Sequence, residues 1–211
     1  MDSDAIWSVI EAERRSLADL LAGLSASEWT VHSLCAGWTV KDVAAHPTLS
    51  TVGVREAVPA FFRARGNFDL MMHQTTAAKA AGSTPEELVA DLRAIATSRR
   101  HPPGTKPVDP MVDILVHGQD IARPLGQDRP IPTDAAAAAA THVWQKSFPY
   151  GARKRFAGLR FEATDAPLAL GDGTPATGPV AAILLVISGR TAALEELRGP
   201  GAALASRALA R

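Results

Sequence analysis

The sequence has a single cysteine, no excess of charge and no long hydrophobic run. One cysteine, Cys35, excludes an intrachain disulfide and a cysteine-rich zinc site. Lysine and arginine together number 22, as do aspartate and glutamate, so the 211-residue chain has a net charge of zero. A neutral chain without a basic stripe is not expected to bind nucleic acid or an anionic membrane surface.

Hydrophobic segments in this chain are too short to cross a membrane. A membrane-spanning helix needs about 18–20 apolar residues, and the longest apolar run is Val180–Ile187. The N-terminal Met-Asp-Ser-Asp is acidic and opens an amphipathic pattern, which is not typical of a secretory signal. We therefore expect a cytoplasmic protein that does not associate with membranes.

The first 125 residues have the hydrophobic pattern of about four helices. Apolar residues between positions 6 and 24 recur at helical period, which predicts a helix over 3–23. Thr39, with Asp42 three residues later, predicts a second helix that starts with a capping box. Pro47 predicts that this helix kinks or ends there. Further helices are expected over about 51–81 with interruptions at Pro59 and Gly66, over 85–100 behind the cap Thr84, and over about 109–126.

The pattern changes after the Pro-Ile-Pro segment at 130–132. An alanine-rich helix is expected over 134–146 and strands over 159–164 and 168–170, with a Gly-Asp-Gly turn at 171–173. Residues 192–197 are expected to be helical, whereas 180–188 are apolar but of uncertain type. The sequence therefore predicts an α+β protein, with a four-helix bundle over 1–128 and a small α/β module over 129–211.

Two histidines and one carboxylate form a candidate metal site. Asp113 and His117 are four residues apart, so on a helix they lie on the same face, and His46 comes from another helix. Two imidazoles and one carboxylate leave an open position on a divalent metal, which a catalytic site needs. Zinc is the preferred metal, with nickel, iron and manganese as alternatives. The alternative interpretation of the pair is a solvated carboxylate beside a core histidine.

Two further residues are candidates for a part in catalysis. Asp120 lies one turn beyond His117, where it can orient the imidazole of that ligand; a helix cap or a surface ion pair is the alternative. The planar guanidinium of Arg190 can bind a carboxylate substrate; a structural surface arginine is the alternative.

Other polar and aromatic residues are interpreted as structural. Cys35 is interpreted as a small buried hydrophobic residue rather than a reactive thiol. Trp29 and Trp38 are expected to be core anchors. His73 can approach the pocket but is interpreted as an ordinary histidine. The remaining histidines without a convincing partner in the sequence are His32, His101 and His142.

Two segments of the sequence resemble the mycothiol-dependent maleylpyruvate isomerase-like family. They are Cys-Ala-Gly-Trp-Thr-Val-x-Asp-Val-x-x-His at 35–46, preceded by Trp29, and Asp-x-x-x-His-x-x-Asp-Ile at 113–121. The Gly-Trp-Thr-Val…His block is the most specific part. Short C-terminal segments at 157–161, 164–165, 171–173 and 189–190 also look like that family, so the resemblance spans most of the chain. It implies membership of the wider DinB-like metal-binding four-helix bundles.

The resemblance also implies a ligand set and a reaction. The family's metal ligands fall on His46, Asp113 and His117, with Asp113 where glutamate is common and Pro47 where other members continue the helix. The implied co-substrate is the thiol mycothiol, whose pKa a metal lowers so that the thiolate forms at neutral pH. The thiolate would add to a small electrophile such as an unsaturated keto acid, with isomerisation or S-transfer as the outcome.

The sequence leaves a second function open besides that of an enzyme. The chain is alternatively a non-catalytic helical bundle that binds a metal or ligand, which Asp113 and Pro47 favour. In the enzyme interpretation the expected partners are a small-molecule substrate and a low-molecular-weight thiol, with no nucleic acid and no membrane. The expected assembly is a monomer or a homodimer.

Overall fold

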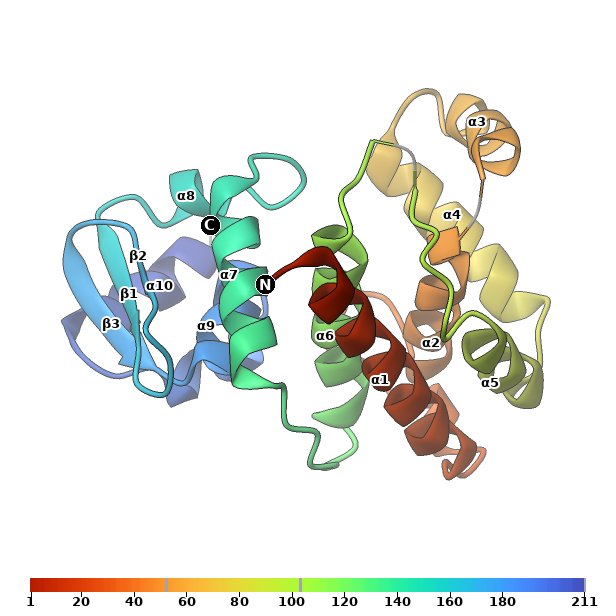
Figure 1. Cartoon of the computed structure of the whole chain (residues 1–211), viewed down its shortest axis with the longest axis horizontal. Coiled ribbons are helices and arrows are strands. Elements are labelled where there is room, and N and C mark those ends of the chain that lie inside the picture. Colours follow the sequence, from red (N-terminus) through yellow and green to blue (C-terminus); the bar gives the residue numbers. More distant parts are fainter. Residues whose placement is uncertain (52, 103, 211) are drawn as a thin grey trace. The chain divides into compact units, whose positions relative to one another are not determined.

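The chain folds into two compact units made mostly of helices, as a computed structural model shows (Figure 1). The structure describes residues 1–51, 53–102 and 104–210. One unit comprises Asp2–Arg129, and the other comprises Pro130–Arg211 together with Met1. The described residues contain helices and one three-stranded sheet, so the predicted α+β class is confirmed. That each unit folds as an independent domain stays a prediction.

The first unit is built from helices, of which α1, α2, α5 and α6 pack against one another. Helix α1 contacts α5 and α6, and α2 contacts α4, α5 and α6. The elements are α1 (Ser3–Ala22), η1 (Glu28–Thr30), α2 (Val40–Thr48), η2 (Leu49–Thr51), α3 (Val54–Arg63), α4 (Phe68–Ala81), α5 (Pro85–Ala94) and α6 (Val108–Ala122). No helix among the described residues is long and apolar enough to cross a membrane.

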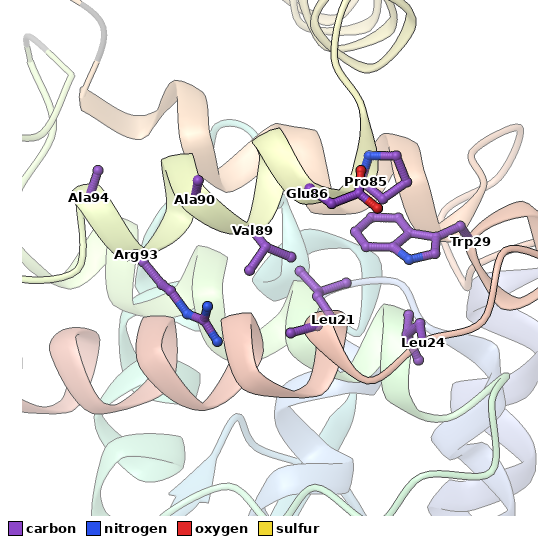
Figure 2. A pocket seen from close by; sticks show the side chains of 10 residues that line it. Leu21, Leu24, Trp29, Pro85, Glu86, Val89, Ala90, Arg93 and Ala94 are labelled. Carbon is purple, nitrogen blue, oxygen red and sulfur yellow. The ribbon is translucent and has the colours of Figure 1, made fainter.

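A cavity of about 660 Å³ lies between α1, η1 and α5 (Figure 2). Its walls are mainly apolar, with Trp29 and Val89 among them, while Glu86 and Arg93 supply charge. None of the three predicted metal ligands lines this cavity.

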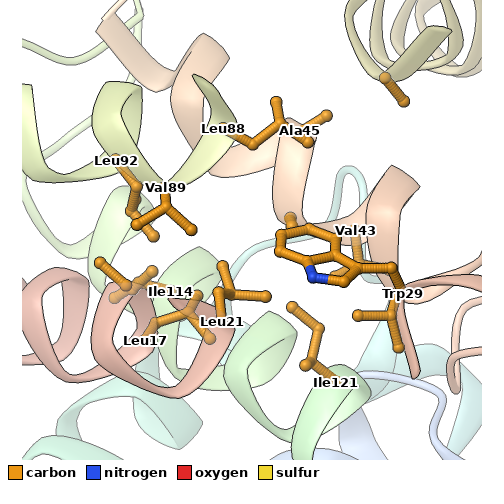
Figure 3. Packing of buried hydrophobic residues seen from close by; sticks show 14 residues of the cluster. Leu17, Leu21, Trp29, Val43, Ala45, Leu88, Val89, Leu92, Ile114 and Ile121 are labelled. Carbon is orange, nitrogen blue, oxygen red and sulfur yellow. The ribbon is translucent and has the colours of Figure 1, made fainter. Parts of the chain in front are cut away.

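The core of the first unit lies where α1, α2, α5 and α6 meet (Figure 3). Leu17, Leu88, Leu92 and Ile121 are at most 2% exposed there. Trp29 is buried in the same cluster, as the sequence predicts, whereas Trp38 is only partly buried at its edge. The same helix faces that make the core therefore fix α2 and α6 side by side.

Local sequence explains where α2 begins and ends. The side chain of Thr39 accepts a hydrogen bond from the Asp42 N–H, and the Asp42 carboxylate accepts one from the Thr39 N–H at 2.8 Å. This capping box satisfies backbone donors that a helix start leaves free. The helix ends at Thr48, directly after Pro47. The predicted start of α2 and its early end are both confirmed.

Helix α5 is shorter than the sequence predicts. It starts at the capping box of Thr84 as expected but ends at Ala94 instead of near Arg100. The guanidinium of the buried Arg14, on α1, donates to the carbonyls of Ile95 and Ser98, both at 2.9 Å. Those bonds satisfy carbonyls in the irregular segment that replaces the last turns of the expected helix.

The stretch over 51–81 also differs in detail from the prediction. Pro59 was expected to interrupt the helix but lies inside α3, whereas Gly66 does fall in the break between α3 and α4. Gly66 has a φ of +76°, a conformation that favours glycine.

The second unit contains a sheet of order β2-β1-β3. Strand β1 pairs antiparallel with β2 and parallel with β3, and Phe161 at its centre is fully buried. Helix α7 packs against α9, and α10 packs against β1 and β3. The elements are α7 (Thr133–Gln145), α8 (Ala152–Arg155), β1 (Leu159–Ala163), β2 (Ala169–Leu170), β3 (Thr174–Gly178), α9 (Val180–Ile187), η3 (Thr191–Glu196) and α10 (Pro200–Leu209).

The Gly-Asp-Gly turn before β3 needs its glycines. Gly173 has a φ of +136°, and a Cβ added there would lie 2.1 Å from the carbonyl oxygen of Gly158. Any larger residue would push β3 away from the chain beside β1. The predicted turn is therefore a steric requirement of the sheet.

We predict that Leu88→Ala lowers the free energy of unfolding by about 2–5 kcal/mol, because it leaves a cavity in the core. Leu88 is fully buried, whereas Leu70 in the same unit is 42% exposed. Leu70→Ala is therefore the control and should change stability by less than about 0.5 kcal/mol. Urea unfolding measures both variants, and equal effects would contradict the assigned core.

Candidate metal centre

Helices α2 and α6 bring the three predicted ligands together. The Nε2 atom of His46, on the last turn of α2, lies 3.2 Å from Oδ1 of Asp113. The Nε2 atom of His117, one turn after Asp113 on α6, lies 3.3 Å from the same oxygen. The three side chains are 14%, 28% and 12% exposed in the order His46, Asp113 and His117. They form a half-buried cluster that solvent can still reach.

The spacing of these atoms fits a metal ion. Zinc binds imidazole nitrogen at about 2.0–2.1 Å and carboxylate oxygen at about 2.0–2.2 Å, so tetrahedral ligand atoms lie roughly 3.3–3.5 Å apart. The two separations from Oδ1 of Asp113, 3.2 and 3.3 Å, lie at the lower end of that range or just below it. They are longer than the usual 2.9–3.0 Å of an N–H···O hydrogen bond. The donor set and its spacing both suit a divalent cation.

Electrostatics in the cluster favour a positive charge beside Asp113. Burial works to raise the pKa of Asp113, but the charges of His46 and His117 and their hydrogen bonds hold it well below its usual range. Burial works to lower the pKa of His117, but the charge of Asp113, with hydrogen bonds to Asp113, Asp120 and Cys35, raises it well above 6.5. In the metal-free protein that positive charge is a proton on His117. A metal ion would take its place.

Asp120, one turn beyond His117 on α6, contacts the imidazole of His117. Its Oδ2 atom is 2.9 Å from Nδ1 of His117, and the carboxylate is fully buried. A carboxylate that accepts the Nδ1 proton leaves Nε2 to face Asp113. With Nδ1 against Asp120, Nε2 of His117 is the nitrogen that faces Asp113.

Cys35 is not the simple buried hydrophobic residue that the sequence suggests. It is partly buried, and its Sγ lies 3.1 Å from Oδ2 of Asp120 and 3.7 Å from Nδ1 of His117. The loop that carries Cys35 folds back onto α6, and no pattern in the sequence predicts this contact. The only sequence feature that points to a role for Cys35 at the site is its position just before the Gly-Trp-Thr-Val block.

Cys35, His117 and Asp120 form a second group of possible metal ligands. Zinc binds sulfur at about 2.3 Å and oxygen at about 2.0 Å, so in a tetrahedral site Sγ of Cys35 and Oδ2 of Asp120 would lie roughly 3.5 Å apart. The observed 3.1 Å from sulfur to oxygen and 2.9 Å from nitrogen to oxygen are shorter. The second group therefore has the spacing of a hydrogen-bonded network, whereas the separations in the first group are closer to those between zinc ligands.

Trp38 covers the cluster instead of anchoring the core. Its ring centroid lies 5.5 Å from that of His46 and 6.4 Å from that of His117. Its indole N–H donates to Nδ1 of His73, on α4, at 3.1 Å. Thr76, one turn further along α4, lies 3.3 Å from Nδ1 of His46. His73 is thus tied to the site through Trp38, which corrects the prediction of an ordinary histidine.

Arg190 belongs to the second unit, at the residue before η3. One guanidinium nitrogen, Nη1, donates to the carbonyl of Ser188 at 2.7 Å. The hydroxyl of Ser188 is buried and has no hydrogen-bond partner in the part of the chain that the structure describes.

His101 lies outside both groups of possible metal ligands found among the described residues. It bonds to Thr105 at 2.9 Å and stacks on Trp7.

Comparisons with known proteins give one family and one fold. A family model described as the mycothiol maleylpyruvate isomerase N-terminal domain matches residues 10–122. A crystal structure of a mycothiol-dependent maleylpyruvate isomerase has a TM-score of 0.66 and 13% identity to this chain, covering 95% of this chain and 93% of that chain. A histidine-to-alanine mutant of such an isomerase gives a TM-score of 0.65 with the same identity and coverage. The structural likeness shows the fold alone, and a search of curated proteins finds no match.

We predict that the purified protein binds about one equivalent of zinc, and that His46→Ala and His117→Ala bind almost none, because each removes one of three ligands. Asp113→Glu should keep or strengthen binding, since the longer side chain still offers a carboxylate. His32→Ala removes an exposed histidine outside both groups and is the control. Mass spectrometry measures the metal content of the unmodified protein and of the four variants. Zinc retained in full by His117→Ala would remove His117 from the site.

Zinc affinity is also expected to rise with pH. The proton on His117 and the metal compete for Nε2, and the raised pKa of His117 keeps that proton on above pH 6.5. Affinity should therefore increase about tenfold per pH unit until the pH passes that pKa. Competition with a chromophoric chelator between about pH 6 and pH 8 measures it. A flat profile would mean that zinc displaces no proton from His117.

Proposed function

The chain belongs to the family of the mycothiol maleylpyruvate isomerase N-terminal domain, and on that premise we propose that it is a metal-dependent enzyme that uses mycothiol to isomerise a small unsaturated keto acid. The observation that carries the proposal is the convergence of His46, Asp113 and His117 at ligand spacing. All three residues lie within the segment 10–122 that matches the family. The family match and the cluster of His46, Asp113 and His117 therefore lie in the same segment of the chain.

The proposed metal ligands are Nε2 of His46, Oδ1 of Asp113 and Nε2 of His117. A divalent metal held there would lower the pKa of a thiol so that the thiolate is present at neutral pH. Zinc is the metal that the donor set favours, and nickel, iron or manganese would also suit nitrogen and oxygen ligands. Three protein ligands leave a position for a fourth partner, as catalytic sites require.

The surrounding residues are assigned roles that do not involve contact with the metal. Asp120 holds the proton on Nδ1 of His117 and so keeps Nε2 turned to Asp113. The Trp38 ring covers the imidazoles of His46 and His117 and limits the access of water from that side. Thr76 lies at hydrogen-bond distance from Nδ1 of His46 and fixes that ring. Each ligand is thus held by a second contact.

The proposed reaction is the reversible addition of a thiol to a conjugated double bond. The carbon–carbon double bond becomes a single bond, rotates and reforms as the thiol leaves unchanged. S-transfer, in which the adduct is the product, is the related outcome, and consumption of the thiol distinguishes it from isomerisation. For Arg190 we propose recognition of a substrate carboxylate through its planar guanidinium, which the bond to the Ser188 carbonyl orients.

Two departures from the family pattern favour a non-catalytic binding protein as the second candidate. Asp113 is one methylene shorter than the common glutamate, and Pro47 follows His46. Against this candidate, Oδ1 of Asp113 lies 3.2 and 3.3 Å from the two imidazoles, and His46 lies within α2 although Pro47 follows it. Neither departure separates the three side chains, so we favour the enzyme.

The test is isomerisation of maleylpyruvate followed by absorbance, with mycothiol added or omitted. We expect activity that needs the thiol, is lost on metal removal by a chelator, and falls at least about 100-fold in His117→Ala. The His32→Ala variant is the matched control and should keep full activity. A zinc-loaded protein that neither isomerises the substrate nor consumes thiol with it would contradict the enzyme and support the binding protein.

A further inference from the structure

We propose that Cys35 is a positioning residue, which acts on His117 through Asp120 and strengthens metal binding without touching the metal. The inference rests on the proposed metal centre and deepens it. It starts from one atom, Oδ2 of Asp120, which lies 2.9 Å from Nδ1 of His117 and 3.1 Å from Sγ of Cys35. Two donors from different parts of the chain converge on a single buried oxygen.

Chemistry decides the direction of both bonds. The thiol of Cys35 donates to Oδ2 of Asp120 at 3.1 Å, and the same carboxyl oxygen accepts a second bond from Nδ1 of His117 at 2.9 Å. The thiol is thus engaged with Asp120 rather than with His117. Its 3.7 Å distance from Nδ1 of His117 is consistent with this, because that nitrogen already donates to the carboxylate.

Burial makes the second donor important. The carboxyl group of Asp120 is fully buried, and a buried polar group needs hydrogen bonds to replace those it loses from water. With Cys35 present, Oδ2 receives two donors whose positions fix the plane of the carboxylate. That plane in turn fixes the plane of the His117 ring and its tautomer.

The loop that carries the thiol is itself fastened to the same residue. The backbone N–H of Leu34 donates to the carbonyl of Asp120 at 3.1 Å. The N–H of Cys35 donates to the hydroxyl of Ser33 at 3.1 Å, and that hydroxyl donates to the carbonyl of Trp38 at 2.9 Å. The loop therefore holds both the thiol behind His117 and the indole of Trp38 over it.

The test is the zinc affinity of the metal-free full-length protein, measured by competition with a chromophoric chelator. We expect Cys35→Ala to bind zinc about tenfold more weakly, since outer partners of metal ligands contribute about 10–100-fold to affinity. Cys35→Ser restores a donor at the same position and should stay within about threefold of the unmodified chain. Thr30→Ala is the control, because Thr30 is exposed and its hydroxyl donates to the nearby Ser27 carbonyl, and it should bind zinc as tightly as the unmodified chain.

A double-mutant cycle separates positioning from packing. If Cys35 acts through Asp120, Cys35→Ala should add little to the loss caused by Asp120→Asn. A purely structural role would lower the melting temperature and leave zinc affinity unchanged, or the two losses would add in full. Either result overturns the proposal while the metal centre stands. Absence of zinc binding in the unmodified chain would overturn the metal centre, and this inference with it.

Discussion

The half-buried carboxylate of Asp113, facing two imidazoles from two helices, is the interaction on which the site depends. A buried carboxylate is unfavourable unless a positive charge compensates it. His46 and His117 supply that compensation, and His117 is supported in turn by Asp120. Asp120 is itself buried and receives the thiol of Cys35. Each of these polar groups is therefore hydrogen-bonded to the next, and together they connect α2, α6 and the loop before α2.

A second buried charge holds the rest of the first unit around this site. Arg14 on α1 is 1% exposed and bonds to the carbonyls of Ile95 and Ser98 and to the hydroxyl of Ser50. Burial lowers its pKa, and the negative charge of Asp113 opposes that shift. Arg14 thus joins α1 to the segment after α5 and to the turn after α2, while it adds positive charge on the side of Asp113.

Local features of the sequence were enough to predict the family, the fold class and the meeting of His46, Asp113 and His117. The i, i+4 spacing of Asp113 and His117 and the capping box of Thr39 depend only on neighbours, so helix geometry predicts them. The end of α5 depends on Arg14, about eighty residues away, and was predicted wrongly. Strand β3, with Pro175 and no alternating apolar residues, was missed because its pairing with β1 decides its conformation. The contact of Cys35 with Asp120 likewise exists only after the loop folds onto α6.

The central claim is that one metal ion binds His46, Asp113 and His117, while Asp120 and Cys35 stay outside its coordination. Anomalous diffraction at the zinc edge from crystals of the zinc-loaded protein tests it most directly. The account predicts a single peak about 2.0–2.2 Å from Nε2 of His46, Oδ1 of Asp113 and Nε2 of His117. A peak bonded to Sγ of Cys35, or no peak in a protein saturated with zinc, would contradict it.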